Sequence, residues 1–261
     1  MEISKNLSLA LVQTHLYWQD PTANRAMLEE KIATISTQPD VIVLPEMFTT
    51  GFTMEASNHA EPMHLHTTKW LQQQSAQTNA AIVGSFIVVE NQQYYNRLFW
   101  VTPDGKIDTY DKRHLFRMAE EHLSYTAGQS KIVKNWRGWR ICPLVCYDLR
   151  FPVWSRNTMM EYDVLIYVAN WPAPRINAWD TLLAARAIEN LAYSVGVNRV
   201  GTDGKGLEYV GHSAAYSFKG ESLCYASQQD TILQVVLERE LLEEYRAKFP
   251  AYKDADDFLI R

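Results

Sequence analysis

Residues 141–152, ICPLVCYDLRFP, pass through five mostly apolar residues to Cys146 and then turn abruptly polar. Similar near-continuous apolar runs occur at 40–48, 80–90 and 163–171. Such runs are typical of strands whose sheet is covered on both faces, because a strand with one wet face alternates polar and apolar residues. The stretch therefore predicts a buried strand that delivers Cys146 to the edge of the core.

Helical patterns alternate with these strands. The first helix is predicted from Asp20, which suits the N-cap position, with Pro21 at the first helical position. The clearest helix is predicted at 178–193, where Trp179 and Leu183 share one face with other apolar residues. Helices of this kind between buried strands indicate an α/β protein.

Two hairpins are predicted as well. One covers 94–112 around the turn residues 102–105, TPDG, and the other covers 131–146 with a turn near Gly138. Hairpins mixed with strand–helix alternation indicate mixed sheets rather than a purely parallel sheet. The remaining predicted elements are strands at 7–16, 194–198, 213–218, 222–226 and 231–237, and helices at about 67–78 and 238–248.

No linker, low-complexity block or internal repeat interrupts the chain, so we expect one α/β domain over residues 1–261, with an acidic tail from about 250.

The formal charge of −5 gives no electrostatic reason to expect nucleic acid or an acidic membrane as a partner. No apolar run approaches the roughly 18–20 residues that span a bilayer. The first 20 residues lack the pattern of a signal peptide.

The three cysteines, Cys142, Cys146 and Cys224, make a poor disulfide framework. On one strand, Cys142 and Cys146 would lie roughly 13 Å apart at about 3.3 Å per residue, well beyond the roughly 7 Å that a bridge allows. We therefore expect a reduced, cytoplasmic protein. The pair His64 and His66 has no third histidine or cysteine at a recognisable interval, so we expect no metal site.

Reactive side chains follow three of the predicted strands: Glu46, Lys112 and Cys146. Strand ends are where a rigid frame meets adaptable loops, and functional groups gather there. A thiol attacks poorly while protonated, a shielded glutamate can take its proton, and an ammonium can stabilise the oxyanion that forms. Each residue also has an ordinary interpretation: Cys146 as a small core hydrophobe, Glu46 as a cap and Lys112 as a solvated charge.

The segments around these three residues resemble the nitrilase superfamily of carbon–nitrogen hydrolases, which uses a Glu–Lys–Cys triad. The matching segments, in the family's order and spacing, are VIVLPEMFTTGF (41–52), YDKRHLF (110–116) and PLVCYDLRFP (143–152). Further similarity runs through ANWP (169–172) and ARAIEN (185–190), so the resemblance covers about nine-tenths of the chain.

The resemblance implies an α-β-β-α sandwich, in which helices flank two central mixed sheets, and a thiol amidase that needs no cofactor or metal. It implies that Cys146 attacks the amide carbon and forms a thioester, and that Glu46 is the general base. Lys112 would hold the oxyanion together with the backbone N–H of Tyr147.

The family also uses a second glutamate, seven residues before a glycine. Glu121 stands seven residues before Gly128, whereas Glu120 fits this interval less well. The resemblance therefore implies that Glu121 positions the Lys112 ammonium and the substrate. The structural alternative for Glu121 is a surface acid in an acidic pair.

Within the superfamily, TTGFTM (49–54) and the loop at 112–128 look most like the omega-amidase branch. That branch hydrolyses the terminal amide of 2-oxoglutaramate and 2-oxosuccinamate to the 2-oxo acid and ammonia. The alternatives are another amidase of the superfamily, acting on deaminated glutathione or on N-carbamoyl groups, and a non-catalytic interaction module on the same fold. An interaction module is the weaker alternative, because all three triad residues are present.

A 2-oxo acid monoamide carries a carboxylate, which the fork of an arginine binds best. Arg150 is the nearest candidate in sequence, and Arg117 and Arg175 are others; each has a structural ion pair as its alternative. Phe116 and Trp171 are the aromatic residues that we expect in the pocket wall.

On resemblance we also expect a homodimer in which the sandwich continues from one subunit to the other. The C-terminal strands and the helix at 178–193 are the candidate surface, although an apolar helix face belongs to the core by default.

Overall fold

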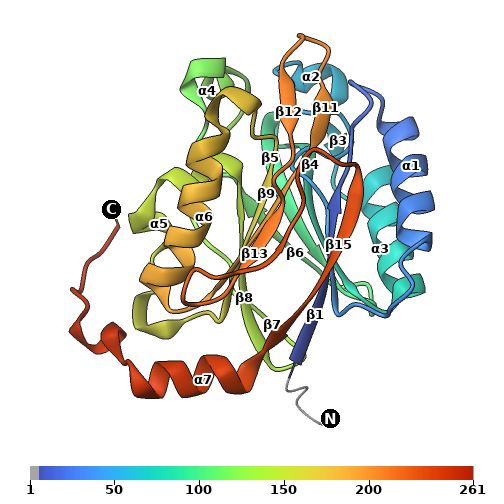
Figure 1. The fold of residues 1–261 in the computed structure, drawn as a ribbon. Coiled ribbons are helices and arrows are strands. Elements are labelled where there is room, and N and C mark those ends of the chain that lie inside the picture. The colour runs from blue at the N-terminus through green and yellow to red at the C-terminus, as the bar shows by residue number, and fades with distance from the viewer. Residues whose placement is uncertain (1–5, 261) are drawn as a thin grey trace.

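The computed structural model describes residues 6–260. Residues 1–5 and 261 lie outside the described part. The predicted domain, 1–261, therefore extends beyond the described residues at both ends, and the segment searched for a signal peptide begins outside them. Two mixed sheets lie against one another with helices outside them (Figure 1). The predicted α-β-β-α sandwich is confirmed.

The first sheet has the strand order β15-β1-β2-β4-β5-β6, and β3 pairs with β4. β1, β2 and β4 run parallel, so the apolar segment 41–43 is paired on both edges. β4, β5 and β6 form an antiparallel meander that includes the first predicted hairpin. The strands are β1 (Asn6–Gln13), β2 (Val41–Val43), β3 (Glu61–Pro62), β4 (Ala81–Glu90), β5 (Gln93–Val101), β6 (Ile107–Asp111) and β15 (Thr231–Glu238).

The second sheet has the order β14-β13-β10-β9-β8-β7. Its central strands β8, β9 and β10 are parallel, with Val145 opposite Val168. Because of this register, Cys146 and Asn170 follow two adjacent strands at the same edge of the sheet. The strands are β7 (Lys134–Trp136), β8 (Trp139–Val145), β9 (Val164–Ala169), β10 (Tyr193–Asn198), β13 (Ala214–Tyr216) and β14 (Ser222–Tyr225).

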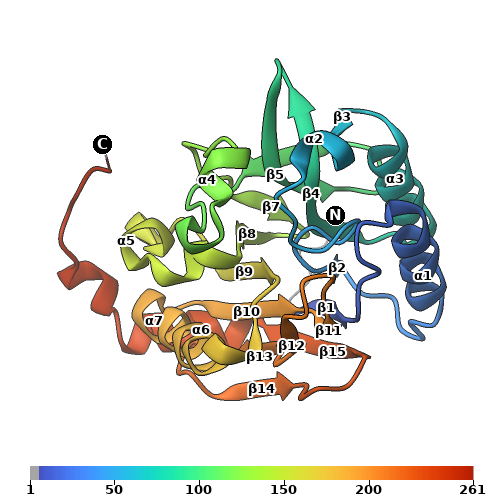
Figure 2. The same cartoon turned by 90° about the horizontal axis from the view of Figure 1, so that it is seen from above.

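Helices α1 (Pro21–Ala33) and α3 (His66–Thr78) cover the outer face of the first sheet, where Leu28 and Leu71 pack on Ile42 and Ile82. Helices α5 (Pro152–Ser155) and α6 (Ile176–Asn190) lie outside the second sheet, as Figures 1 and 2 show. The central strands of each sheet are thus buried on both faces, which explains why polar and apolar residues do not alternate in them.

The helix predicted at 178–193 begins earlier, at Ile176, and ends at Asn190, because Leu191 takes the left-handed conformation with φ 47°. The helix predicted near the C-terminus is α7 (Arg239–Lys248), and the predicted acidic tail contains one short turn, Ala251–Asp254. Within the described residues, the helices are too short or too polar to cross a membrane.

The short elements that were not predicted include α2 (Ala56–His59), α4 (Glu121–Ser124) and the hairpin formed by β11 (Val200–Thr202) and β12 (Glu208–Val210). These three gather at one end of the sandwich (Figure 1). This is the end that Cys146 and Asn170 reach.

Candidate active site

Cys146 is the first residue after β8, as the sequence predicts, and it begins a single 3-10 turn that extends to Arg150. Its φ of 44° lies in the left-handed region, which a residue with a side chain seldom adopts. The side chain is only 8% exposed, and its Sγ atom lies 3.9 Å from the carbonyl oxygen of Asn170. Backbone strain of this kind clusters at functional sites, where the surroundings hold it in place.

Glu46, which follows β2, is completely buried, and its carboxylate is held on both oxygens. Oε1 accepts hydrogen bonds from Asn96 Nδ2 at 2.8 Å and Lys112 Nζ at 2.9 Å. Oε2 accepts from the backbone N–H of Asn170 at 2.8 Å, and the Asn170 side-chain amide donates to the carbonyl oxygen of Glu46. The carboxylate therefore has one fixed orientation beside Cys146.

Lys112 follows β6 and is 1% exposed, so it is no solvated charge. Its Nζ atom lies 2.9 Å and 3.0 Å from the two carboxylate oxygens of Glu121 and 5.1 Å from the centre of the Phe52 ring. Glu121 is completely buried and also accepts the backbone N–H of Phe116 at 2.5 Å. The interpretation of Glu121 as a surface acid is wrong; the neighbouring Glu120 is the exposed member of the pair.

Burial and charge set the protonation states of this cluster. Burial raises the pKa of the Cys146 thiol well above its ordinary value, and Glu46 raises it further, against the opposing effect of Lys112. Burial lowers the pKa of the Lys112 ammonium, but the negative charges of Glu121 and Glu46 have the larger combined effect. The net result is a raised pKa. Burial also raises the pKa of Glu121, although Lys112 opposes this. At rest the thiol thus keeps its proton, and an attack by sulfur requires a base next to it.

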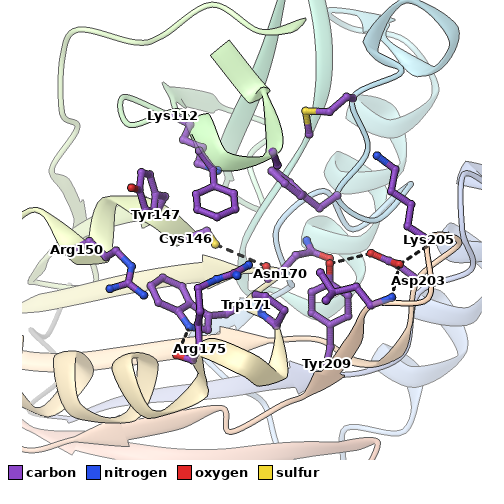
Figure 3. A pocket seen from close by; sticks show the side chains of 16 residues that line it. Lys112, Cys146, Tyr147, Arg150, Asn170, Trp171, Arg175, Asp203, Lys205 and Tyr209 are labelled. Atoms are coloured by element: carbon purple, nitrogen blue, oxygen red, sulfur yellow. Dashed lines mark hydrogen bonds between the residues drawn. The ribbon is translucent and has the colours of Figure 1, made fainter. Parts of the chain in front are cut away.

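A cavity of about 120 Å³ opens over Cys146 and Lys112. Figure 3 shows Cys146 near the middle of the lining residues, with Arg150 to one side and Asp203 and Lys205 to the other. Its aromatic lining residues are Phe52, Phe116, Tyr147, Trp171 and Tyr209. Both predicted wall residues, Phe116 and Trp171, are therefore among those that line the cavity.

Two of the three candidate arginines reach this cavity. The guanidinium of Arg150 lies 4.9 Å from the centre of the Trp171 ring, and that of Arg175 lies 5.0 Å from the centre of the Phe116 ring. Among residues 6–260, neither guanidinium has a carboxylate oxygen within 4.0 Å, so the ion-pair alternative fails for both. Arg117 is exposed and does not line the cavity.

The hairpin β11–β12 forms another part of the wall. Its loop is held by Asp203, whose carboxylate accepts the backbone N–H groups of Lys205 at 2.9 Å and Leu207 at 3.0 Å and the Tyr209 hydroxyl at 3.0 Å. The turn sequence TDGKG (202–206) is the signal that predicts such a loop. Nothing in that local pattern indicates that the loop lies beside Cys146.

Asn96 and Asn170, which hold Glu46, were also missed. Asn170 directly follows β9, so the strand-end argument used for Cys146 applies to it equally. Asn96 is a buried amide within β5, a strand that is otherwise largely apolar in its second half.

Across the described chain, no three His, Cys, Asp or Glu side chains are grouped so that they could hold a metal ion.

The family model for carbon–nitrogen hydrolases matches residues 8–247. The chain belongs to this family, the nitrilase superfamily. It is therefore a hydrolase that acts on carbon–nitrogen bonds other than peptide bonds. The expectation drawn from the three strand-end segments is confirmed at the level of the family.

Two curated relatives are similar over nearly the whole chain. The omega-amidase YafV of Escherichia coli strain K12 is 49% identical over 255 residues, which cover 97% of this chain and 98% of the relative. The 2-oxoglutaramate amidase of Bacillus subtilis strain 168 is 31% identical over 251 residues, which cover 95% and 96%.

Solved structures agree in fold. XC1258 from Xanthomonas campestris, a CN-hydrolase superfamily protein with an arsenic adduct in its active site, matches with a TM-score of 0.97 and 43% identity, covering 99% of this chain and 100% of that chain. Nit3 of Saccharomyces cerevisiae matches with a TM-score of 0.85 and 21% identity, covering 95% and 96%. The similarity to Nit3 concerns the fold alone.

Proposed function

We propose that this chain is a thiol-dependent amidase that hydrolyses the terminal amide of a small 2-oxo dicarboxylic acid monoamide, such as 2-oxoglutaramate or 2-oxosuccinamate. The products are the 2-oxo acid and ammonia. The observation that carries the proposal is the buried cluster of Glu46, Lys112 and Glu121 at Cys146, beneath a small cavity with two arginines that have no ion-pair partner among residues 6–260. The similarity to an omega-amidase and a 2-oxoglutaramate amidase supports this choice of substrate.

In the first step, Cys146 Sγ attacks the amide carbon and Glu46 takes the thiol proton. This base is needed because burial raises the pKa of the thiol. The carbonyl oxygen becomes an oxyanion, which the Lys112 ammonium and the backbone N–H of Tyr147 stabilise. Lys112 stays charged throughout, since two carboxylates raise its pKa.

In the second step, the tetrahedral intermediate collapses and the carbon–nitrogen bond breaks. Glu46 returns the proton to the nitrogen, ammonia leaves, and a thioester remains on Cys146. Glu46 then activates a water that hydrolyses the thioester and restores the thiol. Glu121 keeps the ammonium of Lys112 in place during both halves of the reaction.

At the other end of the substrate, the carboxylate would bind Arg150, Arg175 or both, because each guanidinium lines the cavity without an anionic partner in the described part of the chain. Phe116 and Trp171 stack beneath these two groups and would also contact the carbon chain of the substrate. The volume of about 120 Å³ favours a small monoamide over the larger deaminated glutathione.

The test is ammonia release by the purified protein from 2-oxoglutaramate, glutamine, an N-carbamoyl amino acid and a simple nitrile, with Cys146→Ala as the control. We expect release from the oxo-amide, and none from the variant. Release that survives in Cys146→Ala would refute the mechanism. Release only from the N-carbamoyl compound would favour the alternative amidase, and no release from any of the four compounds would mean that the proposed substrate is wrong.

We further propose that the protein is a homodimer and acts in the cytoplasm. Exposed apolar side chains on α6, β14 and α7, namely Ile188, Leu223 and Leu241, support a subunit interface. The three cysteines are unpaired in the structure, which suits a reducing compartment. Sedimentation velocity would measure the mass of the assembly, and a single species with the mass of one chain would contradict the dimer.

A further inference from the structure

Asp148, two residues after Cys146, is completely buried, and both oxygens of its carboxylate accept hydrogen bonds. Oδ1 accepts the backbone N–H of His114 at 3.1 Å and lies 2.7 Å from His114 Nδ1. Oδ2 accepts the backbone N–H of Val145 at 3.1 Å and the hydroxyl of Tyr110 at 2.7 Å. With the hydrogen of the His114 ring on Nδ1, four donors occupy the four acceptor positions of one carboxylate.

These donors lie beside the reacting groups of the proposed mechanism. Tyr110 and His114 stand two residues before and two residues after Lys112, and Val145 directly precedes Cys146. Tyr110 belongs to β6 in the first sheet, whereas Val145 ends β8 in the second sheet. The Asp148 carboxylate thus links the two sheets at the point where each delivers a reacting side chain.

We propose that Asp148 is a positioning residue that sets the Lys112 ammonium against the Cys146 thiol and holds Cys146 in its left-handed conformation. The inference rests on the proposed roles of Cys146 and Lys112. Asp148 itself does not line the cavity, so it acts through these two residues and not on the substrate.

The network requires a carboxylate, and an amide of the same shape cannot replace it. The Tyr110 hydroxyl oxygen already accepts hydrogen bonds from Trp154 Nε1 at 3.0 Å and the backbone N–H of Arg113 at 3.2 Å. Its hydrogen must therefore point to Asp148, and burial raises the pKa of Tyr110 well above its ordinary value, so the hydroxyl keeps this hydrogen. In Asp148→Asn, an NH2 group would face at least one donor in either orientation of the amide: the backbone N–H of His114 in one, and the backbone N–H of Val145 and the Tyr110 hydroxyl in the other.

The first experiment compares wild type with Asp148→Asn by two measurements: kcat and KM for ammonia release, and the rate at which iodoacetamide alkylates Cys146, followed by mass spectrometry. A misplacement of about 1 Å can lower a rate about 100-fold. We expect kcat to fall about 100-fold, KM to stay within about threefold, and alkylation to slow at least about tenfold.

Asp163→Asn is the matched control. Asp163 is likewise buried and bound to Arg140 and Arg246, but it lies just before β9, at the end of that strand away from Asn170. We expect this variant to lose stability without slowing either reaction. A folded Asp148→Asn protein with wild-type kcat and alkylation rate would overturn the proposal, as would an equal loss of both rates in Asp163→Asn.

Tyr110→Phe is the milder variant, and it tests the proposal if Asp148→Asn does not fold. It removes one of the four donors, so we expect both rates to fall about tenfold; unchanged rates would overturn the proposal. Alkylation needs no substrate. If the wild type released no ammonia but the variants still slowed alkylation, the proposed substrate would be wrong and the role of Asp148 would stand.

Discussion

The ammonium nitrogen of Lys112 lies 2.9 Å from a carboxylate oxygen of Glu46, and the two side chains are 1% and 0% exposed. Glu121 holds the same ammonium from another side, also at 2.9 Å. Two carboxylates and one ammonium are thus buried together, so the cluster holds an excess of negative charge when both acids are ionised. Changes to its members should therefore affect stability and activity in different proportions.

Lys112→Met should be inactive and unstable. It removes an oxyanion donor, which typically lowers a rate about 10²–10³-fold. It also leaves two buried carboxylates without their cation, for which a loss of about 3–5 kcal/mol in the free energy of unfolding is typical. Urea denaturation at pH 7 measures this loss, and wild-type stability would contradict the ion cluster.

The instability of Lys112→Met should depend on pH. Lys112 opposes the burial effect that raises the pKa of Glu121, so its removal raises that pKa further. A carboxyl group whose pKa is higher in the folded state than in the unfolded state destabilises the folded state at high pH. This destabilisation disappears as the pH falls below both pKa values. The stability gap to the wild type should therefore narrow between pH 7 and pH 5. A gap that widens would contradict the prediction.

Glu121→Gln should separate activity from stability. The change leaves one carboxylate and one ammonium in the cluster, and it removes a carboxylate whose pKa burial raises. We expect the free energy of unfolding to stay within about 1 kcal/mol of the wild type, while kcat falls about 10- to 100-fold because Lys112 is less firmly placed. Thermal melts and ammonia release check this. Glu120→Gln, which changes the exposed neighbour, is the control. It should change neither the melting temperature nor kcat.

Arg150→Gln and Arg175→Gln should raise KM for 2-oxoglutaramate. A hydrogen bond to a charged group contributes about 1.5–3 kcal/mol, so the loss of one arginine that binds the carboxylate should raise KM about 10- to 150-fold. Hydrolysis of a simple aliphatic amide without a carboxylate should change little. Arg117→Gln is the matched control, since Arg117 lies outside the cavity. If neither cavity arginine affects KM, the carboxylate binds elsewhere.

Gly128→Ala should disturb the loop that carries Glu121. The Gly128 N–H donates to the carbonyl oxygen of Lys112 at 3.0 Å, and a Cβ atom there would lie 2.0 Å from the carbonyl oxygen of Asp111. The backbone must move, so both the melting temperature and kcat should fall. Gly206→Ala is the comparison, because a Cβ there meets nothing within 4 Å, and only the strain of its positive φ remains. Equal melting temperatures for the two variants would contradict this.

Local patterns predicted much of the molecule. The helix that starts at Asp20 is capped as expected, because the Asp20 side chain accepts the backbone N–H of Ala23 at 2.9 Å. The apolar runs became central strands, and Glu46, Lys112 and Cys146 follow three of them. The helix start and the strand ends depend on residues within about one turn or strand of one another, and that range is where sequence patterns are informative. The choice of Glu121 over Glu120 came instead from the resemblance to the family, whose second glutamate stands seven residues before a glycine.

What the sequence determined by itself was most of the longer strands and helices, the family, and the residues that the strand ends carry. Only the tertiary structure decided which distant groups meet there. Asn170 binds Glu46 across 124 positions of the chain, and Asp148 binds Tyr110 across 38. Such contacts follow from the order of strands in two sheets and from their register. A shift of one residue would turn every side chain of a strand to the opposite face, and that choice is made by long-range packing.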